Sequence, residues 1–210
     1  MPKILIGIQA RLGSSRLPRK SALPFFQDKT LIENIYNKWK NYNNQYTVAI
    51  LAPQGESEDP FWISASQNCK IVYGSDDNLL SRYMTAADHL DADIIIRATG
   101  DNPFVHYQLV DKSIKHFLDN QFDYLSSKSD DGCNVPQGLG IEIFTTQALR
   151  TVYKTADRIA QEHVSEAFLN NSNIRCGFLL DPFNAKEIDL KITSLTLDYL
   201  CQYEMLKGLQ

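Results

Sequence analysis

The fold is decided by the stretch KILIGIQARLGSSRLPRK, residues 3–20. Its first part, Lys3–Ala10, is rich in isoleucine and has the length of one buried β-strand. The pattern then passes into a loop of glycine, serine, proline and basic residues. We therefore expect an opening buried strand followed at once by a polar loop.

Strand and helix patterns alternate through the first half of the chain. Beyond residues 3–10 we expect strands at 46–51, 70–73 and 93–97, with helices at 31–39, 61–68, 79–90 and 107–118. Short strands that alternate with helices predict βαβ units around a mainly parallel sheet. In such a sheet a ligand binds beyond the carboxyl ends of the strands. The loops after Ala10 and Arg97 are therefore the expected site.

The second half is less regular. The polar stretch 126–140 is too long for an ordinary connection, so we interpret it as functional or mobile. A strand is expected at 141–144, helical structure at 146–170, strands at 175–180 and 194–197, and a last helix at 199–209. With no internal repeat and no clear boundary, residues 1–210 are expected to form a single domain.

Composition excludes several classes of protein. The chain has 210 residues, 43% of them hydrophobic, and a formal net charge of −4 from 21 Lys and Arg against 25 Asp and Glu. These values predict a folded core and no general affinity for nucleic acid. The longest apolar runs are strand-sized, whereas a membrane span needs about 20 apolar residues. The absence of a secretory pattern and the four scattered cysteines predict a cytoplasmic protein with reduced thiols.

The loop after the first strand is the strongest functional feature. Four basic residues fall within residues 11–20 of an otherwise acidic chain. Gly13 and the serines that follow it allow the backbone to present N–H groups to an anion. The guanidinium groups of Arg11 and Arg16 each suit two phosphate oxygens, and Lys20 adds a compact charge. We interpret the loop as a polyphosphate site; a solvated basic turn is the alternative. It matches neither a Walker loop nor a GxGxxG turn.

Two carboxylates follow predicted strand ends. Asp101 lies between a glycine and a Pro-terminated turn after the strand 93–97, and Asp198 follows the expected strand 194–197. Carboxylates at neighbouring strand ends suit Mg²⁺ that neutralises a transferring phosphoryl group. For Asp101 alone, a turn-forming role is an equal alternative.

Six blocks of sequence together resemble a known family, the cytidylyltransferases of the spore-coat polysaccharide type, which are relatives of the CMP-KDO and CMP-sialic acid synthetases. The blocks are QARLGSSRLPRK (9–20), GSDDNLLSRY (74–83), RATGDNPF (97–104), PQGLGIEIF (136–144), QEHV (161–164) and LTLD (195–198). They occur in family order and span nearly the whole chain. The first is highly specific, the next two are good, and the others are supportive.

The resemblance implies a three-layer α/β/α fold of the nucleotide-diphospho-sugar-transferase type, with a mixed, mainly parallel sheet. It also implies a reaction in which a hydroxyl of a sugar acid attacks the α-phosphate of CTP and pyrophosphate leaves. The implied catalytic residues are Arg11, Lys20 and Asp101, and the implied Mg²⁺ ligands are Asp101 and Asp198. The implied nucleotide-binding residues are Ala10, Arg11, Gly13, Ser14, Arg16, Lys20, Arg82 and Thr99. The implied acceptor-binding residues are Gln137, Glu142 and His163.

Alternatives stay open for three of these residues. Arg82 either reaches the nucleotide or lies on a helix surface. Glu142 alternates with Ile141 and Ile143, so it either faces solvent or lines the site. His163 is either a contact to the sugar, a general base or a partly buried structural histidine.

The chain departs from the family pattern at three places. Arg19 stands where relatives have glycine, Gly140 replaces an aspartate, and the segment 199–202 differs from the family sequence. The nucleotide half of the motif set is thus intact and the acceptor half is altered. The relatives are commonly dimers, which implies a homodimer contact within the irregular region 126–180.

Two other functions are compatible with this fold. A glycosyltransferase that uses a nucleotide-sugar donor would need a DxD motif, and Asp91–Asp93 spells one, but it precedes a strand instead of following it. A nucleotide-binding partner without catalysis is supported only by the altered acceptor half. The sequence favours the cytidylyltransferase.

Overall fold

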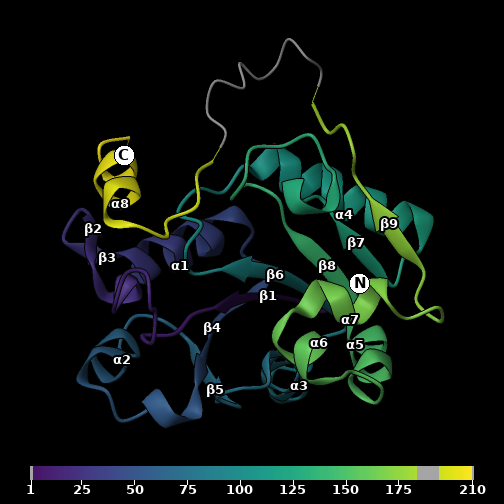
Figure 1. The fold of residues 1–210 in the computed structure, drawn as a ribbon, viewed down its shortest axis with the longest axis horizontal. Helices are drawn as coiled ribbons and strands as arrows, with labels where there is room; N and C mark the ends of the chain where they lie inside the picture. The colour runs from purple at the N-terminus through teal and green to yellow at the C-terminus, as the bar shows by residue number, and fades with distance from the viewer. Residues whose placement is uncertain (1, 184–193, 210) are drawn as a thin grey trace.

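A seven-stranded mixed sheet forms the centre of the computed structural model, which describes residues 2–183 and 194–209 (Figure 1). The strand order is β5-β4-β1-β6-β8-β7-β9. Only β8 runs antiparallel to its neighbours in this sheet. The strands are β1 (Ile4–Gln9), β4 (Thr47–Pro53), β5 (Ile71–Gly74), β6 (Ile94–Thr99), β7 (Tyr124–Ser126), β8 (Glu142–Thr145) and β9 (Cys176–Phe178). A two-stranded ribbon, β2 (Pro24–Phe26) and β3 (Lys29–Thr30), lies beside it.

Helices cover both faces of the sheet, so the expected three-layer α/β/α architecture is confirmed (Figure 1). On one face the core contains Ile4, Ile6 and Ile8 of β1, packed with helices α1 (Leu31–Tyr42), α2 (Pro60–Ala65), α4 (Tyr107–Asn120) and α8 (Leu200–Lys207). On the other face, Leu5 packs with α3 (Leu79–His89), α5 (Thr146–Tyr153), α6 (Arg158–Glu162) and α7 (Val164–Leu169). Successive residues of β1 therefore serve opposite layers, as a strand buried on both faces requires.

The strands and helices predicted for the first half are all present, with ends that differ by a few residues. The predicted helical region 146–170 is divided into three helices. Asp157 ends the first break, because its side-chain Oδ1 accepts a hydrogen bond from the backbone N–H of Ala160 (2.9 Å) and so starts α6. A second break occurs at His163, whose backbone is not helical.

The predicted strand 194–197 was wrong. Among the described residues it is reduced to an isolated bridge between Ser194 and Gln137. The ribbon of β2 and β3 was not predicted from the sequence. Among the described residues, none of the helices has the length and hydropathy of a membrane span.

The register of the sheet brings three strand ends together. Gln9 pairs with Thr99, so β1 and β6 reach their carboxyl ends at the same level, and it pairs with Leu51 of β4, which ends two residues later. Beyond β6, the backbone N–H of Gly100 donates to the carbonyl of Gln9 (2.8 Å). A Cβ atom at Gly100 would lie 3.0 Å from the Cβ of Ala10, so glycine allows the two loops to approach.

Candidate functional site

A cleft of about 780 Å³ lies beyond these strand ends, where a parallel sheet places its ligand site. The volume suits a nucleotide-sized ligand. The loop after β1, the loop after β6, the start of α3 and the region of α6 each contribute to its walls. Most of the residues predicted to bind the nucleotide line this cleft: Ala10, Arg11, Ser14, Arg16, Lys20, Arg82 and Thr99. Asp101 and His163 also line it.

Gly13 is the exception among the predicted nucleotide residues, because it does not line the cleft. The N–H groups of Leu12 and Gly13 donate to the carboxylate of Glu56 instead of facing the cleft. Leu12 N lies 2.9 Å from Glu56 Oε2, and Gly13 N lies 3.3 Å from Oε1. The loop therefore offers side chains, those of Arg11, Ser14 and Arg16, to the cleft and turns these two amides away from it.

Lys20 joins the two predicted metal ligands. Its Nζ lies 3.1 Å from Asp101 Oδ2 and 3.0 Å from Asp198 Oδ1, and it also contacts the carbonyl oxygen of Leu197 at 3.0 Å. Arg16 Nη2 contacts the same Asp198 oxygen at 3.0 Å. Carboxylates that are distant in sequence thus converge on one point, although the strand expected before Asp198 is absent.

The oxygen atoms around Lys20 are of a kind that Mg²⁺ binds. Two carboxylates and a carbonyl oxygen are hard ligands, and Mg²⁺ is commonly bound through one or two carboxylates while substrate phosphates and water complete its shell. Among the described residues, no group of three or more His, Cys, Asp or Glu side chains is arranged to hold a metal. Asp101, Asp198 and the Leu197 carbonyl would fit Mg²⁺ only if substrate phosphates and water supplied its other ligands.

The altered segment after Asp198 has a structural role. The N–H groups of Asp198 and Tyr199 donate to Gln202 Oε1 at 2.7 and 2.9 Å, which fixes the start of α8. The guanidinium of Arg16 lies 5.7 Å from the centre of the Tyr199 ring. Although segment 199–202 differs from the family sequence, Asp198 still lies beside Lys20.

Arg82 is buried, so the helix-surface alternative for it was wrong. It is 5% exposed and donates to the carbonyl of Ser75 from Nε (3.0 Å) and Nη2 (2.8 Å), and to the carbonyl of Asp76 at 3.0 Å. Burial lowers its pKa. Arg82 thus shapes the turn before α3 and also lines the cleft.

The predicted acceptor residues are not brought together. Gln137 is exposed and lies outside the cleft lining, whereas His163 is exposed and lines the cleft from the junction of α6 and α7. Glu142 is 1% exposed, so the solvent-facing alternative was wrong. Its carboxylate forms an ion pair with Arg97 and accepts a hydrogen bond from the Tyr124 hydroxyl (2.9 Å).

Charge and burial compete at Glu142. Burial alone would raise the pKa of Glu142, but Arg97 and Lys128 hold it below its ordinary value. Lys128 Nζ lies 3.4 Å from the carboxylate. The side chain is thus an internal counter-ion, and its partner Arg97 lines the cleft and also donates to Gln9 Oε1 (2.8 Å).

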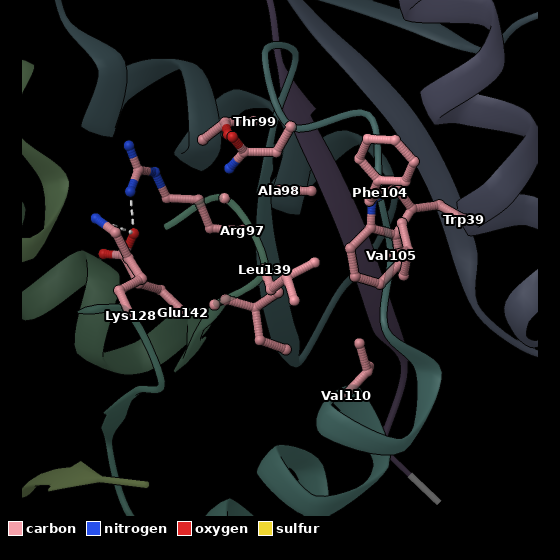
Figure 2. Close-up of a pocket in the computed structure, with 14 residues that line it drawn as sticks. Trp39, Arg97, Ala98, Thr99, Phe104, Val105, Val110, Lys128, Leu139 and Glu142 are labelled. Carbon is pink, nitrogen blue, oxygen red and sulfur yellow. Dashed lines mark hydrogen bonds and ion pairs between the residues drawn. The ribbon is translucent and has the colours of Figure 1, made fainter. Parts of the chain in front are cut away.

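A small recess of about 30 Å³ lies beside the cleft, with Arg97 and Thr99 in the lining of both (Figure 2). Figure 2 shows Arg97, Glu142 and Lys128 at one end and Trp39, Phe104 and Val105 at the other. Within the described residues, the buried oxygens Thr99 Oγ1 and Asn102 Oδ1 have no hydrogen-bond partner. A wall that combines apolar side chains with two unpaired oxygens suits a small ligand group that is partly apolar and partly polar.

Gly140 also lines the recess. A Cβ atom there would lie 2.5 Å from Lys128 Cα and from the carbonyl oxygen of Ser127. An aspartate, as in the family pattern, would require the backbone of this loop to move. The packing around residue 140 therefore leaves room for glycine and not for a larger side chain.

Two further features of the sequence lie away from the cleft. Arg19 makes two hydrogen bonds with the carboxylate of Asp59 (2.8 and 2.9 Å) and does not line the cleft. Its φ of 55° explains why glycine suits this position. Asp91 and Asp93 both contact Lys3, at the amino ends of β1 and β6 and thus opposite the cleft.

Sequence reasoning missed Glu56, Arg97 and Arg158 as candidate functional residues. Arg158, at the start of α6, adds a cation to the cleft wall opposite the loop after β1. Arg97 lies in a block that the resemblance used, but no role was assigned to it. For Glu56, the one available signal was its position just beyond the carboxyl end of a parallel strand.

Comparisons with known proteins give a consistent result. The model of the cytidylyltransferase family matches residues 5–210. The spore coat polysaccharide biosynthesis protein SpsF of Bacillus subtilis is 29% identical over all of this chain and 87% of its own length. An uncharacterised protein of Methanocaldococcus jannaschii is 31% identical over 99% of this chain and 83% of its own. A cytidylyltransferase structure from Leptospira borgpetersenii has a TM-score of 0.83 at 30% identity and covers 99% of this chain and 86% of its own.

Proposed function

Because the chain belongs to the cytidylyltransferase family, we propose that it transfers CMP from CTP to a sugar acid or a related small acceptor, with release of pyrophosphate, for surface polysaccharide assembly. CTP-dependent nucleotidyl transfer is the activity of this family, and the acceptor and pathway are the proposal. The observation that carries it is the convergence of Asp101 and Asp198 on Lys20 at the edge of a basic cleft.

The proposed reaction is an in-line displacement. A hydroxyl oxygen of the acceptor forms a bond to the α-phosphorus of CTP, and the bond from that phosphorus to the oxygen that bridges the α- and β-phosphates breaks. That oxygen leaves as a terminal oxygen of pyrophosphate, and the hydroxyl proton leaves to solvent or to a base. Such a reaction needs positioning and charge neutralisation more than a covalent nucleophile. Arg11, Arg16 and Lys20, with Ser14, would hold the triphosphate, and Ala10 and Thr99 would lie against the nucleoside.

Mg²⁺ is part of the proposal. Asp101 and Asp198 would hold it together with phosphate oxygens, and the ion would neutralise charge on the phosphates when bound. Lys20 contacts both carboxylates, so its ammonium keeps them paired and oriented.

The acceptor would lie between His163 and the recess beside Arg97. Thr99 and Asn102 offer unpaired oxygens to hydroxyl groups of a sugar, and Arg97 and Lys128 present two cations against the one carboxylate of Glu142. A carboxylate on the acceptor would balance that excess charge. The homodimer expected through residues 126–180 stays a prediction.

Pyrophosphate release tests the proposal. The wild type should release pyrophosphate from CTP only with Mg²⁺ and a suitable acceptor, tested over a panel of sugar acids and phosphorylated sugars, while UTP and ATP should serve poorly. Asp101→Asn should lower turnover by at least about a hundredfold, as for the loss of a group that stabilises transition-state charge. Tight CTP binding without release across the panel would favour a non-catalytic partner, and release from a nucleotide-sugar donor would favour a glycosyltransferase.

A further inference from the structure

The loop after β1 is closed on itself and held from behind. The carbonyl oxygen of Leu12 accepts hydrogen bonds from Ser14 N (2.8 Å) and Arg19 N (3.0 Å), which brings the two ends of the loop together. Outside the loop, the carboxylate of Glu56 accepts from the backbone N–H of Leu12 and Gly13. The cleft-lining residues 14–16 follow directly after these anchored positions.

Glu56 is itself anchored in the core. Its Oε2 accepts a hydrogen bond of 2.9 Å from the indole Nε1 of Trp62, a side chain that is completely buried in α2. One carboxylate thus joins three N–H donors from two segments that are distant in sequence. Charge-assisted hydrogen bonds of this kind are among the stronger polar contacts in proteins.

The segment that carries Glu56 also contacts two other parts of the site. This segment, 54–59, connects β4 to α2. Asp59 forms the paired hydrogen bonds to Arg19 at the far end of the basic loop. The N–H of Gly55 donates to Asp76 Oδ1 (2.8 Å) at the start of the opposite cleft wall. Residues 54–59 therefore connect both walls of the cleft.

We propose that Glu56 is a positioning residue for polyphosphate binding, which holds the loop so that Ser14, Ser15 and Arg16 face the cleft. The inference rests on the proposed function and adds a residue that does not touch the substrate. The carboxylate fixes the loop before the nucleotide arrives, so less ordering is needed on binding. Preorganisation of this kind raises affinity without a new contact to the ligand.

A purely electrostatic role predicts the opposite effect. A carboxylate behind a polyphosphate site repels the ligand, and one bound to loop amides also competes with phosphate for them. In either case, removal of Glu56 would strengthen nucleotide binding. Positioning predicts that removal weakens it, so the sign of the change separates the two explanations.

Glu56→Ala, Glu56→Gln and the matched control Glu58→Ala test the role in the full chain. Glu58 is exposed on the same segment, so its replacement removes the same charge. By calorimetry, Glu56→Ala should weaken binding of CTP and of inorganic triphosphate by about tenfold, as for the loss of charge-assisted hydrogen bonds that order a loop. Glu56→Gln keeps one acceptor oxygen but turns an amide NH2 group toward an N–H donor, so it should recover only part of the affinity. In the transfer assay KM for CTP should rise while kcat changes by less than about threefold.

Amide hydrogen exchange gives a readout independent of activity. The N–H groups of Leu12 and Gly13 should exchange at least about tenfold faster in Glu56→Ala than in the wild type or Glu58→Ala. Unchanged or tighter binding in Glu56→Ala would overturn the proposal, as would equal exchange at these amides. If the wild type bound no CTP, the proposed function would fail, while exchange and triphosphate binding would still decide the role of Glu56.

Discussion

Glu142→Gln should destabilise the protein strongly, although the two side chains have nearly the same shape. Glu142 is 1% exposed and pairs with Arg97, whose side chain is 10% exposed. The Tyr124 hydroxyl donates to its other oxygen at 2.9 Å. The amide retains part of the hydrogen bonding but removes the charge that compensates a buried guanidinium.

The magnitude follows from that burial. Removal of one partner of a buried ion pair costs about 3–5 kcal/mol, because the remaining charge is left without compensation. We expect the lower end, about 3 kcal/mol, since glutamine can still accept hydrogen bonds. For a chain of this size, 1 kcal/mol corresponds to about 2–4 °C, so Tm should fall by about 6–12 °C.

Unfolding in urea at a series of pH values checks both the size and the cause. The pKa of Glu142 is held below its ordinary value, so its stabilising contribution is complete above about pH 4.3, the ordinary value for glutamate. The contribution is then lost as the pH falls through the depressed pKa of the folded state. The gap in unfolding free energy between wild type and variant should therefore be constant from about pH 7 to 5 and shrink below about pH 4.

A surface pair supplies the control. Arg150 and Asp88 also form an ion pair, but both side chains are more than half exposed. Asp88→Asn should change stability by no more than about 1 kcal/mol. Equal stability of wild type and Glu142→Gln at pH 7, or a gap that widens in acid, would refute the role of Glu142 as a counter-ion.

Three other outcomes are expected. Lys20→Met should lower CTP turnover by at least about a hundredfold in the pyrophosphate assay, because the ammonium at the carboxylate pair is lost. Gly138 and Gly132 have φ of 93° and 83°, but a Cβ atom would meet backbone at 2.9 Å only at Gly138, so Gly138→Ala should lower Tm further than Gly132→Ala. With a thiol reagent at pH 8, exposed Cys201 should react within minutes and Cys69 only after unfolding, since burial raises the pKa of Cys69 to about 11.

Local patterns were sufficient to predict the layers of the fold. The alternation in β1, which sends Ile6 to one core and Leu5 to the other, is visible in sequence as an uninterrupted apolar run. The helices of the first half follow from apolar residues at helical spacing. The expected strand before Asp198 failed, because a four-residue apolar run does not reveal whether a partner strand is available.

Contacts between distant segments could not be read from patterns. The period-two rule correctly placed Glu142 opposite Ile141 and Ile143, but its surroundings depend on the antiparallel pairing of β8 with β6, which puts Arg97 beside it. Glu56 meets Leu12 across 44 positions of sequence, and no local motif signals the contact. Convergence of Asp101 and Asp198 was anticipated from their expected positions at neighbouring strand ends and from the family resemblance, although the strand expected before Asp198 is absent.

The distribution of charge reconciles an acidic chain with a polyphosphate site. Among the described residues that line the cleft, six side chains are cationic and four are carboxylates, whereas the whole chain has a net charge of −4. The carboxylates are also partly neutralised in place, since Asp101 contacts Lys20 and Asp76 accepts from a backbone N–H. Screening limits electrostatic attraction to about 8 Å at physiological salt, so the remaining acidic surface has little influence inside the cleft. Affinity for CTP should therefore depend on the cleft's own cations and decrease with salt, while neutralisation of surface carboxylates should leave it unchanged.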